Sequence, residues 1–113
     1  MKLNARQQDL LLLLAWLALQ CGQAARAIDL LELQLQARPE HVEARRMLLV
    51  ALLEAGEGVA ALAQCAHLRS LGERAATLWF CQSRAHQLNG QLAAARDTYD
   101  HYLKQKGVDE QVV

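Results

Sequence analysis

The stretch Gly22-Gln23-Ala24-Ala25-Arg26-Ala27 decides the fold, because its first and last residues recur along the chain at a fixed interval. The same glycine and alanine pair returns at Gly56 with Ala61 and at Gly90 with Ala95, each 34 residues after the previous pair. A period of this length indicates a structural unit that is repeated three times.

The glycine and the alanine of each pair have different tasks in a helical hairpin. A glycine after a helix allows the left-handed conformation with which many helices end. An alanine early in the next helix lets two backbones approach closely. A third column, Leu31, Cys65 and Tyr99, keeps the same interval and is expected to fill the space between the helices. A hairpin of about 34 residues is the tetratricopeptide unit.

The sequence therefore predicts an all-α fold of three tetratricopeptide-like hairpins stacked into a short curved solenoid. The hairpins span residues 6–37, 41–71 and 74–106 of a single domain, 1–107, and a flexible tail follows at 108–113. The predicted helices are residues 6–20, 24–37, 41–55, 58–71, 74–88 and 92–106. The middle hairpin is expected to be the softest, because two glycines, Gly56 and Gly58, loosen its turn.

Composition agrees with this fold and excludes several functions. The chain has 23 leucines and 20 alanines, which are strong helix formers, and a single proline. Twelve basic and twelve acidic residues cancel, so the positive charge of a nucleic-acid-binding protein is lacking. No catalytic grouping, phosphate-binding loop or metal-ligand spacing occurs, and we expect no enzyme activity, cofactor or metal. The cysteines, Cys21, Cys65 and Cys81, are expected to be small buried apolar residues in a reducing compartment.

Residues 10–19 form an unbroken apolar run that resembles the core of a signal peptide. Asp9 precedes the run, and Gln20 stands where a lipoprotein signal needs a small residue. The run is also shorter than the roughly 20 residues that span a bilayer. Because it occupies the place of the first helix of the first hairpin, we interpret it as part of a mature cytoplasmic protein without membrane insertion.

A partner is expected on the concave side of the stack, which the first helix of each hairpin lines. Tetratricopeptide geometry places nine residues there: Leu12, Trp16, Leu19, Arg46, Val50, Leu53, Phe80, Arg84 and Gln87. Residues 10–19 are apolar on every face, so a helix packed on one side leaves leucines in water. An amphipathic helix of another protein is the simplest cover. Single residues such as Trp16 or Phe80 can equally belong to the core.

The two arginines of this set, Arg46 and Arg84, suit acidic residues of a partner, because a guanidinium forks onto a carboxylate. For Arg46 the alternative is a local ion pair with Glu43, three residues earlier.

Several short segments resemble the YscY (SctY) family, small chaperones of the bacterial type III secretion system. They are Arg6-Gln7-Gln8, Leu19-Gln20-Cys21-Gly22, Pro39-Glu40-His41, residues 49–53, Ser83-Arg84-Ala85, Gln87-Leu88-Asn89-Gly90 and His101-Tyr102-Leu103. The resemblance extends over residues 6–104 and is poorest at 54–76.

This resemblance implies a cytosolic chaperone of a Gram-negative bacterium, in part peripheral at the secretion apparatus. Its partner would be a small helical secreted protein of the YscX (SctX) type, bound as a heterodimer. The pair would engage the cytosolic domain of the export gate protein, SctV. Two alternatives are a chaperone of another substrate of the same apparatus, such as the needle subunit or a translocator, and a tetratricopeptide adaptor unrelated to secretion.

Overall fold

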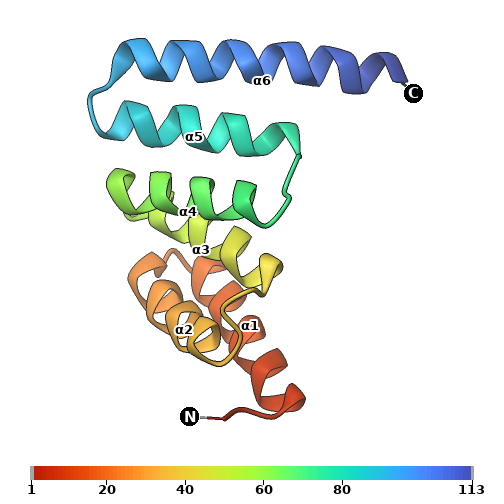
Figure 1. The fold of residues 1–113 in the computed structure, drawn as a ribbon. Helices are drawn as coiled ribbons and strands as arrows, with labels where there is room; N and C mark the ends of the chain where they lie inside the picture. The colour runs from red at the N-terminus through yellow and green to blue at the C-terminus, as the bar shows by residue number, and fades with distance from the viewer. Residues whose placement is uncertain (1, 113) are drawn as a thin grey trace. The chain divides into compact units, whose positions relative to one another are not determined.

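A computed structural model describes residues 2–112, with side chains as far as Val108. Over these residues the chain forms helices and connecting turns and no strand, so the predicted all-α fold is confirmed. The helices, shown in Figure 1, are α1 (Ala5–Gln20), α2 (Ala24–Ala37), α3 (Val42–Glu54), α4 (Gly58–Ser70), α5 (Ala76–Leu88) and α6 (Leu92–Val112).

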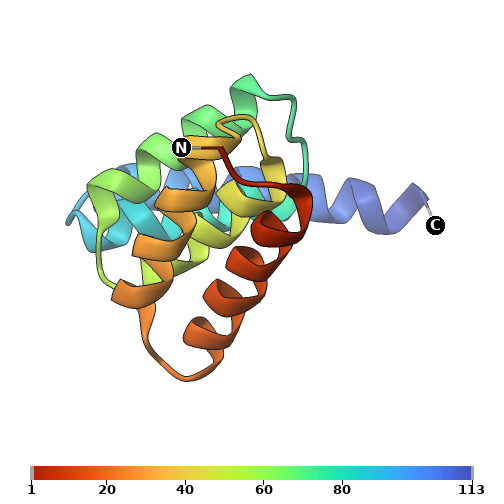
Figure 2. The same ribbon diagram turned by 90° about the horizontal axis from the view of Figure 1, so that it is seen from below.

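The chain divides into two compact units, Met1–Ala55 and Gly56–Val113. In the first unit α1 and α2 form an antiparallel hairpin, visible in Figure 2, and α3 packs against α2. In the second unit α5 packs against α4 and, most extensively, against α6. The two helices of the predicted middle hairpin belong to different units, so that hairpin and the single domain stay predictions.

Glycines with positive φ end the helices at the predicted turns. Gly22, Gly56 and Gly90 have φ angles of 73°, 77° and 73°, and Gly72 has a φ of 94°. After α1 the Gln23 N–H donates to the Ala18 carbonyl at 2.8 Å, and the Gly22 N–H donates to the Leu19 carbonyl at 3.0 Å. This pair of hydrogen bonds is the Schellman motif, which requires a residue in the left-handed conformation. The predicted function of the repeated glycine is thus confirmed.

The helix ends differ from the predicted bounds in two instructive places. At the start of α1, Asn4 and Gln7 form a capping box, because each side chain bonds the other residue's backbone, and the helix begins at Ala5. At the other end of the chain, the prediction that the last helix ends near Lys106 is wrong, because α6 continues to Val112. Gly107 keeps a negative φ, and a glycine without a left-handed turn only weakens a helix.

Small residues occupy the tightest positions of the first unit. Ala15 and Ala18 are the buried residues of α1, and Ala27 of α2 and Ala44 of α3 are fully buried. The leucines that fill the core come from α2 and α3, with Leu31 fully buried. The buried side of α1 therefore consists of small alanines, and its larger side chains lie on its other faces.

The second unit has a close helix contact that the sequence did not reveal. Gly58, the first residue of α4, lies against α5, so that a Cβ added there would stand 2.9 Å from the Ala85 carbonyl oxygen and would clash with the Asn89 side chain. A close contact between α4 and α5 therefore requires a glycine at position 58, which the prediction of a loose turn did not include. In the repeated column, Leu31 and Cys65 are buried as predicted, but Tyr99 is 41% exposed on the last helix.

Candidate functional site

The first unit carries an open groove between α1 and α3, with a volume of about 530 Å³. We call it the α1–α3 groove. It is lined by Trp16, Leu19 and Gln20 of α1 and by Glu43, Arg46, Met47, Val50 and Glu54 of α3.

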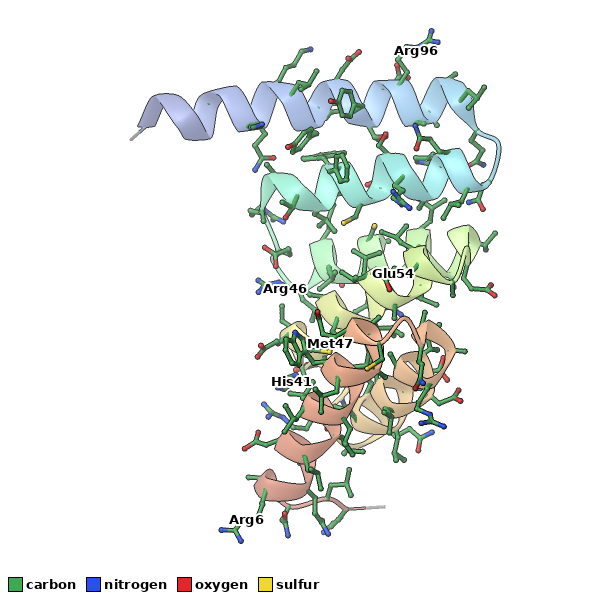
Figure 3. All side chains as sticks on the ribbon, turned by 180° about the vertical axis from the view of Figure 1, so that it is seen from behind. Arg6, His41, Arg46, Met47, Glu54 and Arg96 are labelled. Atoms are coloured by element: carbon green, nitrogen blue, oxygen red, sulfur yellow. The ribbon has the colours of Figure 1, made fainter. Side chains whose placement is uncertain are left out.

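Helical spacing explains how α3 presents its side of the groove. Glu43, Met47, Val50 and Glu54 follow one another at intervals of four, three and four residues, which places them on one face of the helix. This face has a carboxylate at each end and apolar side chains between them. Figure 3 shows Arg46, Met47 and Glu54 along the helix. This face of α3 is about 16 Å long from Glu43 to Glu54, at 1.5 Å per residue, and Met47 and Val50 form its apolar middle.

The large apolar groups of the groove are open to solvent. Trp16 is 48% exposed and Val50 is 42% exposed. The ring of the other tryptophan, Trp79 in the second unit, is in contact with the Arg69 guanidinium at 3.9 Å and is stacked on the His101 ring at 4.7 Å. Trp79 thus has a packing role, whereas Trp16 has an open face.

Four of the six residues predicted for binding in this unit line the groove: Trp16, Leu19, Arg46 and Val50. Leu12 is half-buried and lies outside the lining. Leu53 is only 7% exposed, so its predicted place on an open face is corrected to the buried side of α3. Four further groove residues were not predicted from the sequence: Gln20, Glu43, Met47 and Glu54. The stripe from Glu43 to Glu54 was the signal that could have identified the last two.

The other three predicted residues, Phe80, Arg84 and Gln87, lie on α5 in the second unit. Phe80 is 44% exposed and packs against the rings of Tyr99 and Tyr102, with centroid distances of 6.5 and 5.4 Å. Gln87 lines a shallow cavity of about 360 Å³ together with Leu92 and Tyr99. Arg84 is exposed. This α5–α6 surface is richer in aromatic rings than the sequence analysis anticipated, because Tyr99 and Tyr102 of α6 contribute to it.

A third apolar surface lies on the outer side of the first hairpin. Leu10, Leu13, Leu14 and Leu17 of α1 are between 42% and 53% exposed and follow helical spacing. We call these four residues the α1 leucine stripe. Leu14 and Leu17 also border a cavity of about 340 Å³ shared with Arg26 and Leu30 of α2. The predicted surplus of apolar side chains on this helix is therefore present.

Burial makes the thiols of two of the three cysteines, Cys65 and Cys81, less acidic. Burial raises the pKa of the Cys65 thiol to about 11, with Cys81 adding to the rise, and burial also raises the pKa of Cys81. Both thiols are thus held in the protonated, unreactive form. Cys21 is exposed at the end of α1, which corrects the expectation that all three are buried. Among the side chains described, those of residues 2–108, no three His, Cys, Asp or Glu gather closely enough to hold a metal ion.

Comparison with known proteins gives one consistent result. The chain is 48% identical over 108 residues to the protein named "Chaperone protein YscY" of Yersinia enterocolitica. The aligned residues make up 96% of this chain and 95% of the relative. The Yersinia pestis protein of the same name matches with the same identity and coverage. No family model matches the chain. Within the described residues, none of the helices has the length and apolar character needed to cross a membrane.

Proposed function

Because the chain belongs to the YscY family of type III secretion chaperones, we propose that it binds and stabilises a small secreted export component of the YscX (SctX) type and presents it to the export gate. In this proposal the protein works in the cytoplasm and catalyses no reaction. The α1–α3 groove is the proposed docking site for an amphipathic helix of the partner.

The observation that carries this proposal is that α1 buries small side chains and exposes large apolar ones. Its alanines Ala15 and Ala18 are buried, whereas Trp16 and the α1 leucine stripe are about half exposed. Exposed apolar side chains gathered in this way on a small protein mark an interaction site. Apolar anchors at helical spacing would cover Trp16, Leu19, Met47 and Val50, the apolar part of the α1–α3 groove.

The α5–α6 surface around Phe80 and Gln87 is a second proposed contact. Tyrosine and phenylalanine rings bury a large area at a small cost in side-chain entropy, and such residues are enriched at interfaces. Arg84 is exposed on the same helix, and in this proposal it binds a carboxylate of the partner.

The test is a pull-down of a co-expressed YscX-type protein by the variant Trp16→Glu. Burying one large side chain contributes about 1.5 to 3 kcal/mol, so the variant is expected to bind at least about tenfold more weakly. Val59→Glu is the matched control, because Val59 is 77% exposed on α4 and is outside both proposed surfaces. Circular dichroism checks that both variants keep the helical signal of the wild type.

Two outcomes would contradict the proposal. Unchanged binding by a folded Trp16→Glu variant would remove the α1–α3 groove as the docking site. Binding of a needle subunit or a translocator in place of the YscX-type protein would leave the groove in use and replace the partner.

A further inference from the structure

The electrostatic asymmetry of the α1–α3 groove points to the charge of the bound segment. Two helices end at one end of the groove: Gln20 is the last residue of α1, and Glu54 is the last residue of α3. A helix C-terminus carries about half a negative charge on its terminal carbonyl groups. Neither helix has a basic residue in its last turn to offset this charge.

The Glu54 carboxylate adds a full negative charge to this end, and the side chain is exposed. Glutamate is unfavourable at the C-terminus of a helix, because the charge and the helix dipole repel one another. A positively charged side chain bound at this end would offset both the Glu54 charge and the partial negative charges of the helix C-termini. We call this region, formed by Glu54 and the C-terminal turns of α1 and α3, the acidic end of the groove.

Resting on the proposed function, we infer that the helix bound in the groove places a lysine or arginine over the acidic end, next to its apolar anchors. Glu43, at the other end of the same face, lies in the first turn of α3, where the helix dipole stabilises a carboxylate. The groove therefore favours an amphipathic segment with a basic residue at its Glu54 end.

The experiment measures the affinity of the full chain for two designed, fluorescently labelled helical peptides by anisotropy. Both peptides have the same leucine anchors at helical spacing, and only the residue after the last anchor differs, lysine in one and glutamate in the other. The wild type is expected to prefer the lysine peptide about two- to fivefold, the range of an exposed ion pair. This preference should weaken as salt is added, because salt screens exposed charges.

The variant Glu54→Lys is expected to reverse the preference. Glu32→Lys makes the same charge change on the exposed face of α2, outside the groove, and should leave the preference of the wild type intact. An unchanged preference in Glu54→Lys would overturn the inference and leave the groove as a docking site. Failure of Trp16→Glu to weaken either peptide would instead contradict the proposed function.

Discussion

The helices α1 and α6 both expose large apolar side chains, among them Leu92 and Leu103 of α6, but only α6 also has a charged outer face. Each lies at one end of its unit's order of packed helices. α6 turns Arg96, Asp97, Asp100 and Lys104 to solvent, and Arg96 points away from α5 in Figure 3. α1 turns the α1 leucine stripe to solvent.

This difference indicates which of the two helices can stay exposed to water without a partner. The terminal helix of a stacked-hairpin protein needs a polar outer face to stay soluble, and α6 has one. α1 meets this condition only with a cover, because its own hairpin already accommodates the alanines Ala15 and Ala18. In the proposed function the surfaces of α1 therefore bind the partner, and the polar face of α6 stays in water.

The largest expected effect concerns self-association. We expect the isolated wild type to self-associate and the variant Leu10→Gln/Leu13→Gln/Leu17→Gln to be a monomer. Each leucine is about half exposed, so burying the rest contributes about 1 kcal/mol, and losing three lowers association roughly a hundredfold. Sedimentation velocity over a concentration series measures this.

The control also introduces three glutamines, on the outer face of α6, in Ala93→Gln/Asp97→Gln/Asp100→Gln, and it should leave association unaltered because no exposed leucine is removed. A wild type that stays monomeric at high concentration would contradict the contrast between the two helices. Self-association that persists in the leucine variant and vanishes in Trp16→Glu would place it in the α1–α3 groove.

The second prediction concerns the buried alanines of α1. Ala15 is fully buried, so Ala15→Leu should lower the free energy of unfolding by about 1 to 3 kcal/mol through overpacking. Leu17→Ala on the same helix should change stability by less, because Leu17 is 44% exposed. Urea unfolding followed by circular dichroism compares the two.

Ala93→Leu on the exposed face of α6 is the control and should be close to neutral. A larger loss for Leu17→Ala than for Ala15→Leu would show that the leucine, and not the alanine, holds α1 in place.

The third prediction compares the thiol at the end of α1 with the buried thiol of the second unit. The folded state raises the pKa of Cys65 from 9.0 to about 11, so it favours the protonated thiol. The contribution of the protonated Cys65 thiol to the free energy of unfolding is complete below pH 9 and is lost as the pH rises toward 11. By pH 10 the loss is about 1 kcal/mol.

Urea unfolding at pH 8 and at pH 10 measures this loss, and Cys65→Ala should reduce it. A thiol reagent at pH 8 should label Cys21, which is exposed, well before Cys65. Equal labelling rates for the two cysteines would show that the second unit opens readily.

The sequence predicted the features that depend on a few neighbouring residues. The turn at Gly22 and both ends of α2 match, because a left-handed glycine and a proline two residues after the helix act locally. The end of α6 was missed because Gly107 is a weak helix breaker without a turn that requires it.

The candidate site was predicted only in part, because a side chain's exposure depends on which helices pack around it. α3 has buried residues from Ala44 to Leu53 on nearly every face, so the apolar run at 48–53 offers no periodicity that separates Leu53 from Val50. Glu54 was overlooked for a related reason: its importance comes from the end of α1 beside it. The contact of Gly58 with α5 is likewise non-local.

The last prediction compares buried polar groups in the two units. In the first unit Gln34 of α2 is fully buried, and neither its amide nitrogen nor its amide oxygen has a hydrogen-bond partner among the described residues. In the second unit the buried Ser83 donates its hydroxyl proton to the Ala95 carbonyl of α6 at 2.7 Å. An unsatisfied buried amide costs about 1 to 3 kcal/mol, whereas a satisfied hydroxyl contributes about 0.5 to 1.5 kcal/mol. Gln34→Met should therefore raise the free energy of unfolding, and Ser83→Ala should lower it by a smaller amount. Thermal unfolding of the two variants beside the wild type measures both signs, and a destabilised Gln34→Met variant would mean that the amide is hydrogen-bonded in solution.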